Sequence, residues 1–154
     1  HSCCVLVAPL ADSMGVTITN NITDDGVWIY GDVLRIKQVL INLLTNSVKF
    51  TPRSGSVTLD YAETEDGGGQ ISVADTGVGM SSDDIAMAME KFGRISHEIE
   101  NGVQGTGLGL PLSSGLMVLH DGLLNIDSNP GAGTTIRLRL PQERMRMMPA
   151  GASA

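Results

Sequence analysis

The sequence predicts an α+β fold in which about five strands form one mixed sheet and helices gather on one face of it. Short runs of β-branched residues alternate with turn residues, and one long segment, residues 33–49, has apolar positions at helical spacing. No internal repeat is evident. A chain of 154 residues has room for one domain with a real core.

Six segments are rich in β-branched and apolar residues and are bounded by turn residues, which is typical of strands. The acidic glycine tip at residues 65–69 predicts an antiparallel hairpin, and the Asn129-Pro130-Gly131 turn joins the last two strands. We expect strands at residues 16–19, 27–30, 57–62, 70–74, 123–127 and 134–140.

The helices have clear start and stop signals. The segment Val33–Lys49 begins behind the N-cap Asp32 and ends before Thr51-Pro52. Residues 108–119 predict a second apolar helix, and a short helix is expected at about residues 83–90, followed by a mobile lid.

Three parts are expected along the chain. Residues 1–14 are interpreted as the end of an upstream linker or helix, and residues 15–140 as the domain. Residues 141–154 carry no pattern and are expected to be disordered.

Composition excludes several classes of protein. Hydrophobic residues make up 42% of the chain and charged residues 18%, which favours a globular fold. A net charge of −7 argues against polynucleotide binding. The only cysteines, Cys3 and Cys4, are adjacent and fit a reducing setting. Because no apolar run approaches the ~20 residues of a bilayer span and no signal peptide is evident, we expect a soluble, cytoplasmic piece whose parent can still be membrane-anchored.

The helix at residues 33–49 has a polar row that includes Asn42, Asn46 and Lys49. Asparagine is a poor helix former, so two of them one turn apart cost stability unless their amides have a task. An amide oxygen can bind Mg²⁺, and a lysine one turn on can contact phosphates. The alternative is an ordinary solvated helix face.

Two glycine-rich segments add to this pattern. Asp75 ends an apolar strand and is followed by Gly77 and Gly79, which puts a fixed acceptor beside backbone that a ligand can approach closely. Alone, this segment is equally compatible with a plain strand exit. Residues 105–110 open a helix, where free amides favour an anion. They match neither a P-loop nor a dinucleotide fingerprint.

In this order, the segments resemble the catalytic and ATP-binding domain of sensor histidine kinases, within the GHKL superfamily of gyrase-, chaperone- and mismatch-repair-type ATPases. The resemblance spans about residues 15–140 and implies the two-layer α/β sandwich called the Bergerat ATP-binding fold, with an ATP lid at residues 81–104. The amino-acid sequence around residues 90–94 and 109–113 resembles that of alphaproteobacterial cell-cycle kinases. The matching boxes are the N box at 31–51, the G1 box at 75–79, the F box at 91–94, the G2 box at 105–110 and a final glycine box at 131–135.

The resemblance implies a role for each residue that matches a box. Asp75 would accept the adenine amino group, Asn46 would be the magnesium ligand, and Asn42 and Lys49 would be the catalytic residues. The G2 amides would hold the β and γ phosphates, and Arg94 would add positive charge. The expected residues that bind ATP and Mg²⁺ are Asn42, Asn46, Lys49, Asp75, Gly77, Gly79, Arg94, Gly105, Thr106, Gly107, Leu108, Gly109, Thr134 and Thr135.

The type of reaction also follows from the resemblance. In related hydrolases a glutamate stands at the position of Asn42 and activates water, but an asparagine cannot accept that proton. The site therefore suits transfer of the γ-phosphoryl group to an outside nucleophile. The resemblance implies a histidine on a separate dimerisation domain as acceptor, then a response-regulator aspartate, with a monomeric isolated domain in a homodimeric parent and no contact with nucleic acid or membrane.

Two alternatives stay open. One is a pseudokinase or phosphatase-biased module in which nucleotide only switches the conformation, and the other is a chaperone- or topoisomerase-like hydrolase. His97 lies inside the expected lid and lacks the pattern of an acceptor histidine. His120 lies in a helix-to-strand turn and is expected to have a structural role.

Overall fold

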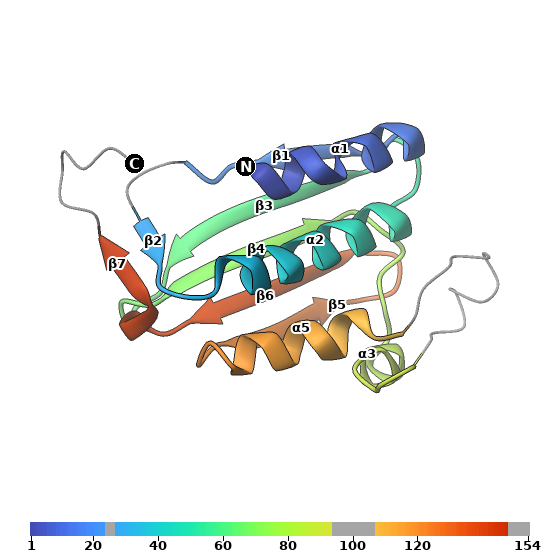
Figure 1. Cartoon of the computed structure of the whole chain (residues 1–154). Coiled ribbons are helices and arrows are strands. Elements are labelled where there is room, and N and C mark those ends of the chain that lie inside the picture. The colour runs from blue at the N-terminus through green and yellow to red at the C-terminus, as the bar shows by residue number, and fades with distance from the viewer. Residues whose placement is uncertain (24–26, 94–106, 148–154) are drawn as a thin grey trace.

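The computed structural model describes residues 1–23, 27–93 and 107–147 (Figure 1). A single five-stranded sheet has the strand order β1-β3-β4-β6-β5. β1 and β3 run parallel and all other neighbours run antiparallel, so the sheet is mixed, as predicted. The strands are β1 (Thr17–Asn20), β3 (Ser56–Glu63), β4 (Gly69–Asp75), β5 (Leu123–Ser128) and β6 (Thr134–Leu140).

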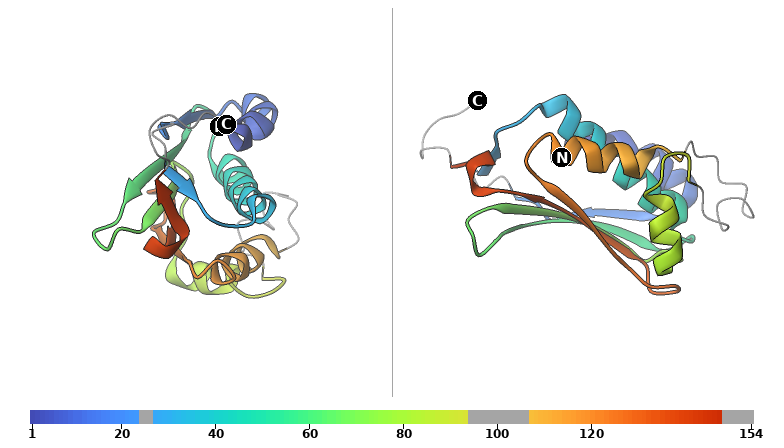
Figure 2. Two further views of the ribbon diagram at one scale, coloured as in Figure 1. Left: turned by 60° about the vertical axis from the view of Figure 1, so that its left-hand side comes forward. Right: turned by 90° about the horizontal axis from the view of Figure 1, so that it is seen from below.

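Three helices cover one face of this sheet: α1 (Ser2–Met14), α2 (Val33–Phe50) and α5 (Gly109–Val118). Figure 2 shows them in one layer above the strands, with the short helix α3 (Ser82–Ala88) at one end of the sheet. This arrangement confirms the predicted two-layer α/β sandwich with helices on one side.

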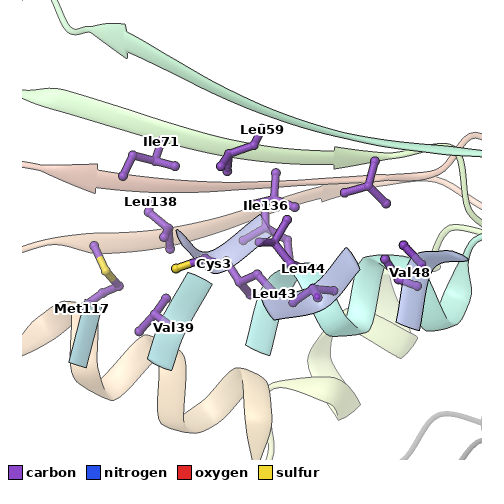
Figure 3. Close-up of a cluster of buried hydrophobic side chains, with 14 of the residues drawn as sticks. Cys3, Val39, Leu43, Leu44, Val48, Leu59, Ile71, Met117, Ile136 and Leu138 are labelled. Carbon is purple, nitrogen blue, oxygen red and sulfur yellow. The ribbon is translucent and has the colours of Figure 1, made fainter. Parts of the chain in front are cut away.

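The core lies between the two layers. Leu43, Leu44 and Val48 of α2 are fully buried and cluster with inward-facing residues of the sheet, among them Leu59 and Ile136 (Figure 3). The buried residues of α2 recur at helical spacing and those of the strands alternate, which is why both periodicities could be detected in the sequence.

The helix α2 follows its sequence signals closely. The Asp32 carboxylate accepts hydrogen bonds from the N–H groups of Leu34 at 2.9 Å and Arg35 at 3.2 Å, and so caps the first turn. The helix ends at Phe50, because Thr51 is extended ahead of Pro52. The cap and the stop fix the position of α2 in the chain, and α2 carries both asparagines of the candidate site.

Residues 2–14 form a helix that belongs to the packed domain. Cys3, Val7 and Ala11 are buried with the rest of the core, and Gly15 ends α1 in the left-handed conformation. The structure therefore shows no separation between this segment and the domain at residue 15.

Among the described residues, two strands lie outside the main sheet. The strand expected at residues 27–30 is observed as β2 (Val27–Ile29), which pairs antiparallel with β7 (Met145–Met147) in a separate ribbon. The expected disorder therefore does not apply to residues 141–147, which form a 3₁₀ turn at Gln142–Arg144 and then β7. Residues 148–154 lie outside the described part. The pairing partner is far away in the sequence, so no local pattern indicated it.

Candidate nucleotide site

A pocket opens where β4 ends, between the second half of α2 and the first turn of α5. Its walls are mainly apolar, and Asp75 is the one acidic side chain among the described residues that line it. Residues from both glycine-rich segments, 75–79 and 105–110, and from α2 line this pocket. The lining includes Asn46, Asp75, Gly79, Leu110, Thr134 and Ile136.

Asp75 is held in a fixed orientation at the end of β4. Its Oδ1 accepts the backbone N–H of Gly77 at 2.9 Å and that of Thr134 at 3.1 Å. Burial raises the pKa of the Asp75 carboxyl, and hydrogen bonds from Gly77, the Ser47 hydroxyl and Thr134 oppose part of that rise. The result is a half-buried acceptor in an apolar pocket, which suits a flat ligand that carries an N–H donor.

The loop after Asp75 packs tightly against the turn between β5 and β6. Gly79 has φ +69°, and a Cβ added there would overlap the carbonyl oxygen of Asn129, so glycine is required at this position. The Met80 N–H donates to the Ser128 hydroxyl at 2.8 Å. Loop and turn therefore form one supported wall of the pocket.

The two asparagines of α2 differ in their surroundings. Asn46 lines the pocket with Asp75, as expected. The Nδ2 of Asn42 instead donates to the Ser113 hydroxyl of α5 at 3.0 Å, and Asn42 lines an adjoining groove with Leu108 and Gly109. Lys49 lies in the last turn of α2 and does not line the pocket.

The backbone that leads into α5 is described from Gly107 onward, and a hydrogen bond holds it there. The Gly107 carbonyl accepts the N–H of Phe92 at 3.0 Å, and Leu108 is the N-cap residue of α5. A helix N-terminus beside the pocket offers unpaired N–H groups to an anion. Arg94, Gly105, Thr106 and most of the expected lid lie outside the described residues.

The structure separates Thr134 from Thr135. Thr134 lines the pocket, but successive strand residues face opposite sides, so Thr135 lies on the face away from the helices and the structure does not bring it to the pocket. Alternation with the buried Ile136 could have shown this. Sequence reasoning also missed Ser47, which hydrogen-bonds Asp75, and Ser113, for which the sequence contains no comparable signal.

The donor set at the pocket fits magnesium that arrives with phosphates. Among the residues that the structure describes, no group of three or more His, Cys, Asp or Glu side chains could hold a metal ion. Mg²⁺ often keeps several waters and binds through one or two protein oxygens together with substrate phosphates. The amide oxygen of Asn46, in the pocket of Asp75, is the kind of protein ligand that this mode of binding needs.

Comparison with known proteins identifies the family. The model of the histidine kinase-, DNA gyrase B- and HSP90-like ATPases matches residues 31–144. Histidine protein kinase DivJ of Caulobacter vibrioides is 40% identical over 85% of this chain and 22% of its own length. Cell-division control histidine kinase PdhS of Brucella abortus is 34% identical over 91% of this chain and 14% of its own length.

A solved structure agrees with these relatives. Full-length ShkA in complex with AMPPNP matches with a TM-score of 0.81 and 29% identity, over 97% of this chain and 30% of that one. The chain belongs to the histidine kinase-, gyrase B- and HSP90-like ATPase family. Within it, the chain is an ATP-binding domain of the histidine kinase type, and its similarity to alphaproteobacterial cell-cycle kinases is confirmed.

The chain covers only a small part of these relatives, 22% of DivJ and 14% of PdhS. Within residues 1–23, 27–93 and 107–147, no helix has both the length and the apolar character that a bilayer span needs.

Proposed function

We propose that this chain binds Mg²⁺-ATP and transfers the γ-phosphoryl group to a histidine on a separate dimerisation domain, from which it passes to a response-regulator aspartate. The observation that carries the proposal is the half-buried, oriented carboxylate of Asp75, which shares a pocket with Asn46. Membership of the ATPase family and the relatives named as histidine kinases support it.

Each part of the nucleotide has a matching part of the site. The adenine would lie in the apolar pocket with its amino group donating to Asp75. The phosphates would lie toward the N-terminus of α5, near Gly107–Gly109, with Lys49 and the boxes at 91–94 and 105–106 completing the contacts. Mg²⁺, held through Asn46, would neutralise phosphate charge as it develops.

In the proposed reaction, a nitrogen of the acceptor imidazole attacks the γ-phosphorus. A P–N bond forms, the bond between that phosphorus and the β–γ bridging oxygen breaks, and ADP leaves with that oxygen's electron pair. The imidazole loses its ring proton to solvent. Asn42 has no basic group and its amide nitrogen is engaged by Ser113, which favours transfer over activation of water.

The test combines binding with transfer. Calorimetric titration of the chain with ATP and GTP, with and without Mg²⁺, measures recognition, and labelled ATP with a separately supplied acceptor-helix domain measures transfer. We expect a preference for ATP over GTP and label on histidine. Binding without label would favour a nucleotide-switched pseudokinase, and steady hydrolysis by the chain alone would favour the hydrolase alternative.

A further inference from the structure

The carboxamide of Asn42 is enclosed by one face of α5. Its Nδ2 donates to the Ser113 hydroxyl at 3.0 Å, across 71 positions of sequence. Ser113 is only 2% exposed, so water has little access to this hydroxyl and does not compete for the hydrogen bond. The contact joins the helix that carries both asparagines to the helix that begins beside the phosphate end of the site.

Gly109 lies one turn before Ser113 on α5 and meets the other end of the same carboxamide. A Cβ added at Gly109 would overlap the Oδ1 of Asn42, so glycine leaves the space that this oxygen occupies. The carboxamide as a whole lies against Gly109, the first residue of α5, with its oxygen nearer than its nitrogen, and the nitrogen donates to Ser113.

Electrostatics favours the same orientation. The N-terminus of a helix carries a partial positive charge, so an amide oxygen is more stable there than an amide NH₂ group. A rotated carboxamide would bring its NH₂ group closest to Gly109 and would make the Ser113 hydroxyl the donor to the amide oxygen, since a hydroxyl can donate or accept. The hydrogen bond holds the amide at Ser113, and the helix dipole favours the observed one of two nearly isosteric orientations.

We propose that Ser113 is a positioning residue that holds the carboxamide of Asn42 with its oxygen toward the phosphate end of the site. The inference rests on the proposed function and adds a residue outside the family boxes. Its consequence is that the amide oxygen, an acceptor, lies nearest the N-terminus of α5, where a hydrated cation with its phosphates can use it.

The test uses the full chain labelled with ¹⁵N. The side-chain amide signals of Asn42 are assigned by their loss in Asn42→Asp, and their exchange with water is measured without nucleotide. We expect slow exchange in the parent and exchange at least tenfold faster in Ser113→Ala. ATP affinity in Mg²⁺ should fall by about fivefold in Ser113→Ala, the weight of one hydrogen bond, with little change in its absence.

Ser114→Ala is the matched control, because Ser114 is the next residue of α5 and, among the described residues, the Asn42 amide donates to Ser113 and not to Ser114; this variant should behave as the parent does. Ser113→Cys keeps nearly the same volume with a much weaker acceptor, and it replaces Ser113→Ala if that variant loses its folded spectrum. Unchanged Asn42 exchange in the folded variant overturns the inference. Failure of the parent to bind ATP would instead reject the proposed function.

Discussion

Two opposing effects act on the Asp75 carboxylate: hydrogen bonds stabilise its charged form, and burial destabilises it. As a ligand acceptor it must be charged and oriented, and hydrogen bonds from Gly77 and Thr134 hold it so. As a half-buried group it is less stable in the charged form, since burial raises the pKa of its carboxyl. The charged form of Asp75 therefore lowers the stability of the domain without ligand. A ligand that donates a hydrogen bond to the carboxylate would offset this loss.

Asp75→Asn should reduce ATP affinity by at least tenfold and abolish the preference for ATP over GTP, because the charge-assisted bond to the adenine amino group is lost. Calorimetric titration with both nucleotides measures this. Asp127→Asn, at an exposed position on β5, is the control and should bind ATP as the parent does. Retained selectivity in Asp75→Asn would place adenine recognition elsewhere.

The raised pKa of Asp75 also predicts how stability depends on pH. In the unfolded chain the carboxyl titrates near pH 4, about its ordinary value. The native state binds this proton more readily, so its contribution to the free energy of unfolding falls as pH rises from about 4 through the raised pKa and stays low above it. Urea denaturation at a series of pH values should show this slope in the parent and not in Asp75→Asn. Identical slopes would contradict it.

Asn46→Ala tests the magnesium ligand. We expect the increase in ATP affinity that Mg²⁺ produces to fall about tenfold, because the phosphates and the metal lose their protein oxygen. Affinity without Mg²⁺ should change little. Asn125→Ala, at an exposed strand position, controls for loss of an asparagine. A Mg²⁺ dependence equal to that of the parent would remove Asn46 from the metal site.

At the scale of elements, α2 and α5 are joined at both ends of their contact. Besides Asn42–Ser113, the buried His120 after α5 accepts the N–H of Asp32 on its Nε2 at 3.1 Å. Its Nδ1 lies 2.7 Å from the Leu116 carbonyl, so Nδ1 carries the proton that donates there. The ring thereby connects the N-cap of one site helix to the last turns of the other.

His120→Ala should lower the free energy of unfolding by about 1–3 kcal/mol, because the N–H of Asp32 loses its partner and a buried ring is removed. Leu119→Ala is the matched control, since Leu119 is 74% exposed and should change stability by less than about 0.5 kcal/mol. Chemical denaturation measures both. Equal effects of the two substitutions would reject this connection between the helices.

At the scale of the whole molecule, the ends of the described chain are part of the fold. α1 contributes three buried residues to the core, and β7 pairs with β2. Arg144 joins the ribbon to the turn after α5 through an ion pair with Asp121 at 2.8 Å. The packed unit is therefore larger than residues 15–140.

Two valines of α1 test this conclusion. Val7 is 3% exposed and Val5 is 57% exposed. Val7→Ala should lower the free energy of unfolding by roughly 1–2.5 kcal/mol and Val5→Ala by less than about 0.5 kcal/mol, since only the first leaves a cavity. Thermal unfolding of both variants, with ATP titration, measures the effect. Equal free energies of unfolding for the two variants would show that α1 does not contribute to the core.

Most of the fold could be predicted from local signals. The helix expected at residues 33–49 is observed at Val33–Phe50, because its cap, its apolar spacing and its stop all lie within a few residues of its ends. Within the site, Asp75 and Asn46 meet as expected. Thr135 does not line the pocket, because side chains alternate between the two sides of β6 and Thr134 takes the side that faces the helices.

The order of the boxes, the helix periodicity and the family can be recognised in the sequence, since each depends on residues close together in the chain. The parallel pairing of β1 with β3, the pairing of β2 with β7 and the contact of Asn42 with Ser113 become visible only in the folded molecule. These pairings join residues far apart in sequence, and packing of the whole core selects them. That is why the orientation of an amide in the site could not be inferred from its motif.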